Sequence, residues 1–384
     1  MFKNEIKTNQ LIRASFVYFI ILVFFVLLRL SVSLGFLVWL DDNTLDIVYT
    51  LITQIGIMLF IPIFFVNKIK KQKTINTLKN DFGFKKIKFE SILVSVLIGG
   101  LAFLLNIAVA SFFSGILQLF GYTPPTSSSG DSVTTWSAFI VAIIFTGLLP
   151  AICEEITHRG LLLNGLKQLG VKRAIIFSSI LFGLIHLNVM QTFYAIVMGA
   201  LMATTVVISG SIIPAIIIHF MNNSINVYLS FAKVKGFLGA DFYSSIESFV
   251  SSYGVITAFL FIGILLLGIV LTIWGLIITL KNLQRHTIAN ENIKNDILIN
   301  QDNNDIQNSQ NYNESEKIAK LRKIFIYSPT SLFSYTRKPR FFDKLFPPAF
   351  EECYTVNTKE KFFLYSSLFL GGIITIFTYI WGVM

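Results

Sequence analysis

Residues 136–166 read WSAFIVAIIFTGLLPAICEEITHRGLLLNGL, an apolar run that surrounds two adjacent carboxylates, Glu154 and Glu155. About 20 apolar residues are enough for a helix that crosses a bilayer. A charged side chain at the centre of such a helix costs at least ~2.5–3.5 kcal/mol on insertion scales, so it marks a candidate functional site. The stretch therefore predicts a membrane helix that carries a polar site.

The apolar character extends over the whole chain of 384 residues, of which 54% are hydrophobic and 14% charged. Such a composition is typical of a membrane protein and not of a soluble domain. The sequence therefore predicts an all-α fold, a polytopic transmembrane helix bundle of about nine spans. The candidate spans are at about 14–40, 47–66, 92–117, 136–166, 174–190, 193–208, 212–230, 252–280 and 362–384.

Basic residues gather in the loops between the apolar stretches, and the net charge of the chain is +10. Lysines are concentrated in residues 67–90, and Lys3, Lys7 and Arg13 precede the first apolar stretch. Because cytoplasmic loops carry an excess of Lys and Arg, we expect both segments on the cytoplasmic side of a plasma membrane. The charge then serves topology, and we predict no nucleic-acid partner. The Lys-, Asn- and Ile-rich composition favours a bacterial protein.

The chain divides into four regions. Residues 1–90 hold two candidate spans and the basic loop, and residues 91–280 hold the polar residues described next. Residues 281–361 are rich in Asn and then basic, which is typical of a partly disordered linker on the cytoplasmic side. Residues 362–384 form a last candidate span. Since no motif lies in the C-terminal extension, we expect truncation after about residue 285 to leave any activity intact.

The two glutamates are expected to have different roles. Glu155 and Arg159 are four residues apart, which places them on one face of a helix, where the guanidinium can pair with the carboxylate. Glu154 points about 100° away and stays free for chemistry. His158 lies beside Arg159 and is a candidate accessory group.

Two later apolar stretches each carry one histidine, His186 and His219, and Asn223 follows His219 by four residues on the same helical face. Glu154 and His186 each lie about 20 Å along a helix from the basic loop 167–173, so we expect them at one depth. A single histidine in an apolar helix more often makes a structural hydrogen bond. Four polar residues at compatible depths instead predict one site.

Two chemistries fit this set of residues. A buried glutamate beside a histidine is a general base for water, and His219 and Asn223 can donate hydrogen bonds to a developing oxyanion. Alternatively, Glu154, His186 and His219 are a ligand set for a catalytic Zn²⁺ with one open position. Both schemes activate water for attack on a carbonyl, so both predict hydrolysis of a peptide bond. The amide of Asn223 favours the metal-free scheme, because a neutral amide is a poor zinc ligand.

Three motifs in order, Glu-Glu-x-x-x-Arg at 154–159, Phe-x-x-x-His at 182–186 and His-x-x-x-Asn at 219–223, resemble those of the CPBP intramembrane proteases. That family includes type II CAAX prenyl endopeptidases and bacteriocin-processing and immunity proteins. The resemblance covers about residues 90–280, and His158 departs from it, since an aromatic residue is expected there. The family has been described both as metal-dependent and as glutamate-dependent, so the resemblance leaves zinc open. It implies an intramembrane endopeptidase with these roles: water activation by Glu154 and His186, oxyanion binding by His219 and Asn223, and support of the first helix by Glu155 and Arg159.

Two other functions stay open at the level of the sequence. A non-catalytic membrane immunity or scaffold protein would share the fold but would not need the four polar residues. A transporter with a buried Glu/His proton relay would fit the polar residues, but the two halves of the chain show no internal repeat. We therefore expect an enzyme that acts on a membrane-associated protein or peptide in the lipid bilayer. In a bacterial cell, prenylated CAAX proteins are not the expected substrate, and the sequence specifies no oligomeric state.

Overall fold

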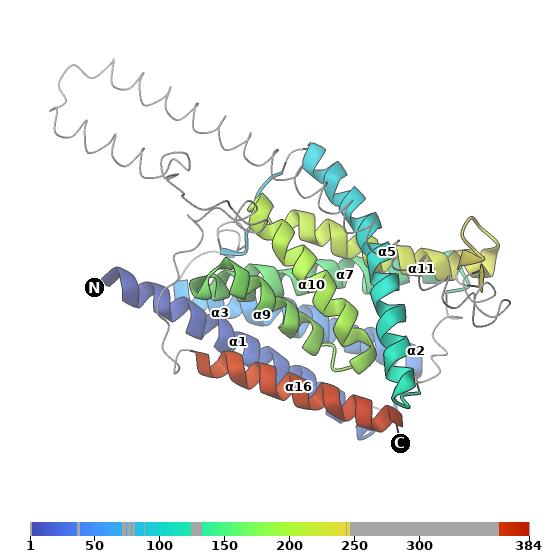
Figure 1. Ribbon diagram of the computed structural model, residues 1–384, viewed down its shortest axis with the longest axis horizontal. Helices are drawn as coiled ribbons and strands as arrows, with labels where there is room; N and C mark the ends of the chain where they lie inside the picture. Colours follow the sequence, from blue (N-terminus) through green and yellow to red (C-terminus); the bar gives the residue numbers. More distant parts are fainter. Residues whose placement is uncertain are drawn as a thin grey trace, which may run out of the picture.

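The structure is a computed structural model of the chain (Figure 1). It describes residues 2–245, apart from 37–38, 71–73, 75–77, 79–80, 88, 124–132 and 243, and it describes residues 361–383. The predicted span at 252–280 lies outside the described residues, as does the predicted linker up to residue 360.

The N-terminal part forms two long helical segments, α1 (Phe2–Ser33) and a second one that changes its winding along its length. The second begins as α2 (Asp42–Thr50), continues as the π-helix η1 (Leu51–Phe60) and ends as α3 (Ile61–Lys70). Asp41 caps its start, because its carboxylate accepts a hydrogen bond from the backbone N–H of Thr44 at 3.0 Å. π-helical turns are rare, and those that do occur often lie at functional sites. η1 is therefore a candidate part of such a site.

The stretch with the two glutamates follows α5 (Phe89–Leu119) and is also wound irregularly. It consists of α6 (Trp136–Ala142), the π-helix η4 (Ile143–Leu148), α7 (Leu149–Glu155), the π-helix η5 (Ile156–Leu163), α8 (Asn164–Leu166) and a 3₁₀ turn, η6 (Lys167–Leu169). The other helices are α9 (Val171–Leu184), α10 (Val189–Ser209), α11 (Ile213–Lys235) and α16 (Phe362–Val383). All these elements are helical, so the predicted all-α fold is confirmed for the described residues.

The count of nine spans is not confirmed. Within the described residues, 6 helices are long and apolar enough to cross a membrane: Gln10–Ser33, Thr44–Lys68, Phe89–Leu119, Trp136–Leu169, Val189–Ser209 and Phe362–Ile380. The span expected at 174–190 is replaced by α9, which has 14 residues. Its rise of about 21 Å is shorter than the ~30 Å hydrocarbon core. A helix does form at the span expected at 212–230, namely α11, but it is not among the six.

α9 and α10 form a tight helical hairpin next to the glutamate-bearing stretch (Figure 1). Small residues permit the close approach, as is common between membrane helices. A Cβ atom added to Gly183 would lie 2.6 Å from the backbone oxygen of Thr192, and one added to Gly199 would lie 3.0 Å from the Cα atom of Ser179. Both helices of the hairpin therefore pack together against η5.

The C-terminal helix α16 lies along α1 and also reaches the α9–α10 hairpin (Figure 1). The rings of Phe16 and Phe363 meet edge to face with centroids 4.8 Å apart. The Thr378 hydroxyl accepts a hydrogen bond from the backbone N–H of Val189, the first residue of α10, at 3.1 Å. Although its sequence carries no motif, α16 is packed into the helical body, and this packing argues against the expectation that the C-terminal extension is dispensable.

The basic loop and two other connections meet at one end of the bundle. The backbone N–H of Ile212 donates to the carbonyl of Gly83 at 3.0 Å, and the Ser211 hydroxyl donates to the carbonyl of Lys85 at 2.8 Å. The Asn164 side chain donates to the carbonyl of Asp81 at 3.0 Å. Residues 81–85 of the basic loop and the stretch 164–173 thus share one end, in agreement with the topology expected from the charges. Which side of the membrane this end faces stays a prediction.

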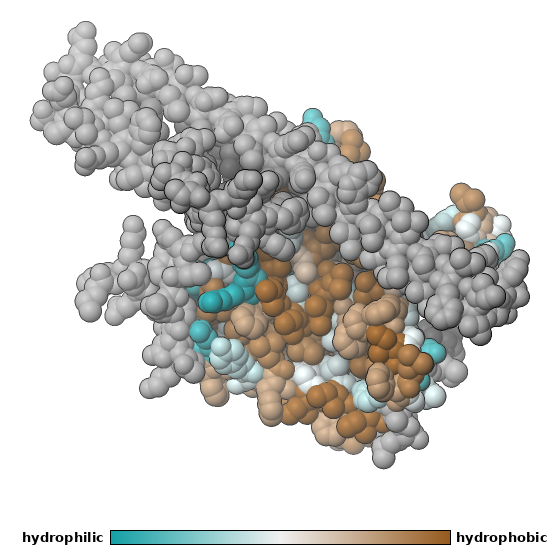
Figure 2. All heavy atoms as spheres, viewed as in Figure 1, coloured by the Kyte–Doolittle hydropathy of each residue, from teal (hydrophilic) through white to brown (hydrophobic). Residues whose placement is uncertain are grey.

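The outer surface is apolar where the helices face outward. In the view of Figure 2, hydrophobic side chains cover most of the surface that the described residues form. Phe24, Leu97 and Phe369 are among the exposed large side chains, with 49%, 54% and 71% of their area accessible. Contiguous apolar surface of this kind marks contact with lipid or with another protein. Together with the six long apolar helices, it identifies a multi-pass membrane protein.

Candidate functional site

The two neighbouring glutamates at the end of α7 occupy opposite environments. Glu155 is 0% exposed, and its Oε1 atom accepts a hydrogen bond from Nη1 of Arg159 at 3.0 Å. This is the i, i+4 pair that the sequence predicts, and it persists although Arg159 belongs to the π-helix η5. Glu154 is only partly buried, and its carboxylate accepts from the neutral amide of Gln54 at 2.9 Å. Glu155 is therefore buried in an ion pair, whereas Glu154 has no cationic partner among the described residues.

Arg159 ties Glu155 to the α9–α10 hairpin. Its side chain is buried, and Nη2 donates to the backbone oxygen of Gly199 in α10 at 3.4 Å. The guanidinium also lies over the ring of Phe182 at 4.4 Å, a cation–π contact. A buried charge is tolerated only when it is paired and hydrogen-bonded. Arg159 thus connects η5, α9 and α10, and it fixes the place of Glu155 between them.

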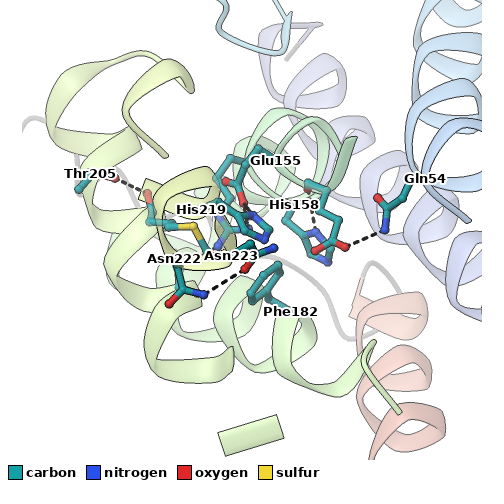
Figure 3. Close-up of polar contacts among 12 residues, drawn as sticks. Gln54, Glu155, His158, Phe182, Thr205, His219, Asn222 and Asn223 are labelled. Atoms are coloured by element: carbon teal, nitrogen blue, oxygen red, sulfur yellow. Dashed lines mark hydrogen bonds and ion pairs between the residues drawn. The ribbon is translucent and has the colours of Figure 1, made fainter. Parts of the chain in front are cut away.

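His219 meets Glu155 and not Glu154. Its Nδ1 atom lies 3.0 Å from the same Oε1 atom that accepts from Arg159. Because an ionised carboxylate only accepts, Nδ1 carries the proton in this pair, and Nε2 is left for a second partner. Figure 3 shows Glu155 and His219 directly beside each other. The sequence places His219 in the site but does not indicate this partner.

His186 occupies a turn and not the interior of a span, which corrects the sequence-based expectation. α9 ends at Leu184, and the chain turns before α10 begins at Val189. Leu187 in this turn has φ +49°, a left-handed conformation that is uncommon for a leucine. The Nδ1 atom of His186 lies 2.8 Å from the carbonyl oxygen of Phe182, so Nδ1 donates and the Nε2 lone pair remains available.

Phe182 is the centre around which the histidines gather. His158, His186 and His219 each meet its ring edge to face, with centroid distances of 4.9, 5.3 and 5.9 Å. Phe182 is itself buried, so its ring packs against all three imidazoles from the inside; Figure 3 shows it with His158 and His219. The predicted residues His186 and His219 are thereby brought to one place. No hydrogen bond joins either to Glu154 among the residues that the structure describes.

His158, the candidate accessory group, is fully buried and both of its ring nitrogens have neighbours. Nδ1 lies 2.8 Å from the backbone oxygen of Glu154, and Nε2 lies 3.3 Å from the Tyr18 hydroxyl. That hydroxyl donates to the carbonyl of Leu181 in α9 at 2.9 Å. His158 therefore braces η5 against α1 and α9, a structural position.

Asn223 stands at the end of a chain of three amides. Asn106 of α5 donates to Asn222 at 2.9 Å, and Asn222 donates to the side-chain oxygen of Asn223 at 3.0 Å. Asn223 in turn donates to the carbonyl of Thr146 in η4 at 3.0 Å. Since its oxygen is already an acceptor in this chain, the orientation of its amide is defined. Its Nδ2 atom has one further N–H to donate.

Several residues of this arrangement are not among the candidates from the sequence, namely Gln54, Tyr18, Asn106 and Asn222. Gln54 and Asn106 do leave a signal, because each is a polar residue inside a predicted span and such residues tend to be functional. The signal does not tell which of them meet the glutamates.

The predicted zinc ligands do not form a metal-binding cluster. Across the described part of the chain, no group of three or more His, Cys, Asp and Glu side chains is arranged to hold a metal ion. Glu154 accepts a hydrogen bond from an amide, whereas the Nδ1 contacts of His186 and His219 leave both Nε2 atoms available and do not themselves argue against a metal. We therefore derive no step through a metal.

Comparison with known proteins agrees with this picture over part of the chain. Residues 136–225 match the family model described as type II CAAX prenyl endopeptidase Rce1-like. The matched segment runs from α6 into α11, and it contains all six of the predicted site residues. The resemblance inferred from the three motifs is thus confirmed for this segment. No curated protein and no solved structure matches the chain.

Proposed function

We propose, with the match of residues 136–225 to type II CAAX prenyl endopeptidases as the premise, that this protein is an intramembrane endopeptidase. Its substrate is a peptide bond of a membrane-associated protein or peptide. One observation carries the proposal beyond the family match. The carboxylate of Glu155 is bound by Arg159 and His219, whereas the carboxylate of Glu154 is partly exposed and has no cationic partner among the described residues. A scaffold has no need for such a group in an apolar bundle.

In the proposed reaction Glu154 is the general base. It takes one proton from a water molecule while the hydroxide forms a bond to the carbonyl carbon of the scissile peptide. His186 orients that water, because its Nε2 lone pair accepts the second O–H. The electron pair of the carbonyl moves onto oxygen and gives a tetrahedral oxyanion. When the C–N bond breaks, Glu154 returns its proton to the leaving nitrogen.

The oxyanion is held by His219 and Asn223. Asn223 has one N–H free after its bond to Thr146. His219 donates from Nε2 when it is protonated, and Glu155 then serves as the counter-ion at Nδ1. Donors that are fixed before the reaction stabilise developing charge most effectively, since they need no reorganisation. Under this proposal Glu155 and Arg159 act through His219, as a support.

The test is cleavage by purified protein in detergent or bilayers, against a panel of membrane-associated peptides, with products identified by mass spectrometry. Glu154→Gln keeps the shape of the side chain and the contact with Gln54 but removes the base. We expect a loss of roughly 10²–10⁴-fold in kcat, the usual contribution of a general base. Glu90→Gln, at the exposed start of α5, is the matched control. Equal cleavage by wild type and Glu154→Gln would refute the proposal.

We further propose that the protein resides in a bacterial plasma membrane with its N-terminus in the cytoplasm, as the basic loop 67–90 suggests. A single cysteine introduced at residue 76, in a background without Cys153 and Cys353, should resist membrane-impermeant labelling from outside intact cells. Labelling of that residue from outside would reverse the topology.

A further inference from the structure

Gln54 reaches the candidate site from outside the segment that matches the peptidase family. It belongs to the π-helix η1, and its Nε2 atom donates to Oε1 of Glu154 at 2.9 Å. Figure 3 shows Gln54 extending from a separate helix toward the site. The matched segment begins only at residue 136, so this contact links Glu154 to a helix that the family comparison does not cover.

The orientation of this amide is set by its partner. An ionised carboxylate can only accept, so the amide must present Nε2, and a rotated amide would bring two oxygens together. The carbonyl oxygen of Gln54 then points elsewhere, and it is buried without a hydrogen-bond partner among the described residues. Leaving a buried acceptor without a hydrogen bond destabilises the folded protein. An apolar residue of similar size would avoid that cost, so the stability of the fold alone does not account for a glutamine here.

The backbone around Gln54 is held in register with the helix that bears Glu154. The Thr157 hydroxyl of η5 donates to the carbonyl of Met58 in η1 at 2.5 Å. Gln54 is 7% exposed and Met58 is 1% exposed, so both lie inside the interface between the two helices. A side chain placed by such an interface keeps its geometry and can impose it on a neighbour.

We propose that Gln54 is a positioning residue of the peptidase site, which holds the carboxylate of Glu154 in one orientation. The proposal rests on the peptidase function, because a base needs a fixed direction toward its water. A hydrogen bond from a fixed donor defines the direction of a carboxylate oxygen. A neutral amide does this without neutralising the base, unlike the arginine that is paired with Glu155. Gln54 acts through Glu154 and does not touch the substrate.

The experiment uses the full-length protein with Gln54→Met, which keeps the length of the side chain and removes both the donor and the unpartnered oxygen. Gln54→Leu is a second variant in case the first does not fold. Gln168→Met is the matched control, because Gln168 is also 7% exposed, has one unpartnered amide atom and contacts the backbone of Leu11 instead of the site. Thermal unfolding in detergent establishes that each variant is folded.

Two readouts separate positioning from a structural role. The first is kinetic: kcat should fall roughly 10-fold or more with KM unchanged, since a misplacement of ~1 Å can cost about 10²-fold. The second needs no substrate. A hydrophobic carbodiimide reacts with carboxyl groups that are free to meet it, and mass spectrometry reports whether release from Gln54 makes Glu154 more reactive. Labelling of Glu154 should rise in Gln54→Met and stay at the wild-type level in Gln168→Met.

The outcomes distinguish the two claims. If folded Gln54→Met matches wild type in both kcat and carbodiimide labelling, Gln54 does not position Glu154. If kcat falls equally in Gln54→Met and Gln168→Met, the effect is one of folding and the proposal is also overturned. If wild type shows no cleavage that depends on Glu154, the peptidase function fails, whereas the labelling still reports whether Gln54 governs the carboxylate.

Discussion

The segment 136–225 and the helices around it contribute different things to the candidate site. The segment contains the candidate site residues, and it is the part that matches a known family. The surrounding helices supply neutral partners for this segment. Gln54 of η1 contacts Glu154 directly, whereas Tyr18 of α1, Asn106 of α5 and Thr378 of α16 contact His158, Asn222 and the backbone of Val189. A family model that covers only the segment leaves out these contacts.

This division predicts that removal of a buried charge inside the segment damages both folding and activity, whereas removal of a polar partner in a surrounding helix mainly changes activity. The largest effect is expected for Arg159→Ala. Removal of the guanidinium takes away the permanent charge that pairs with buried Glu155 and leaves His219 as its partner, and breaking a buried ion pair costs about 3–5 kcal/mol. Thermal unfolding in detergent should show a much lower midpoint, with no cleavage. Arg173→Ala removes an exposed arginine of α9 and should unfold like wild type. A stable Arg159→Ala would mean that Glu155 is not held as the geometry suggests.

The second prediction concerns α16 and uses two adjacent glycines. A Cβ atom on Gly371 would lie 2.9 Å from the Cβ atom of Leu184, at the end of α9, whereas one on Gly372 would meet nothing within 4 Å. Gly371→Ala should therefore push α16 away from the turn that carries His186, at a cost of about 1–3 kcal/mol, and reduce cleavage. Gly372→Ala should do neither. Thermal unfolding and kcat of the two variants are the measurements.

An equal response of the two glycine variants would restore the interpretation drawn from the sequence, in which the C-terminal extension is separate from the site. The sequence favours that interpretation because α16 carries no Asp, Glu, His, Lys or Arg and follows a long polar stretch. Its docking depends on apolar contacts and on the hydroxyl of Thr378, and such contacts leave no pattern in one sequence.

What the sequence does reveal follows from the cost of polar groups in an apolar helix. Glu154, Glu155 and His219 stand out because each interrupts a long apolar run, and the i, i+4 rule identifies the partner of Glu155 correctly. The turn at His186 is hidden, because the residues on both sides of it are as apolar as a continuous helix. The contact between His219 and Glu155 is hidden as well, since helical spacing says which residues share a face but not which face meets which helix.

The third prediction tests the chain of amides at its far end. Asn106→Leu removes the donor to Asn222 but touches no reactive group. Asn223 then loses part of its constraint, and we expect kcat to fall roughly 10-fold. For Asn223→Ala we expect a larger loss, about 10²–10³-fold, which is typical for removal of an oxyanion donor. Gln118→Leu, an exposed residue of the same helix, is the control. If Asn106→Leu equals wild type in kcat, Asn223 is oriented by Thr146 alone.

The smallest effect is expected from removal of metal ions. Zinc would need Glu154, His186 and His219 to converge, and no such group of three is arranged to hold a metal ion among the described residues, where Glu154 is bound to Gln54. Asn223 adds a neutral amide, a weak zinc ligand and a good oxyanion donor. We therefore expect full cleavage after dialysis against a chelator, with less than stoichiometric zinc by elemental analysis. Loss of activity on chelation and its return with zinc would show that these contacts rearrange around a metal. In that case, the helices outside 136–225 would position metal ligands and not a free base, and Gln54→Met would weaken zinc binding as well as kcat.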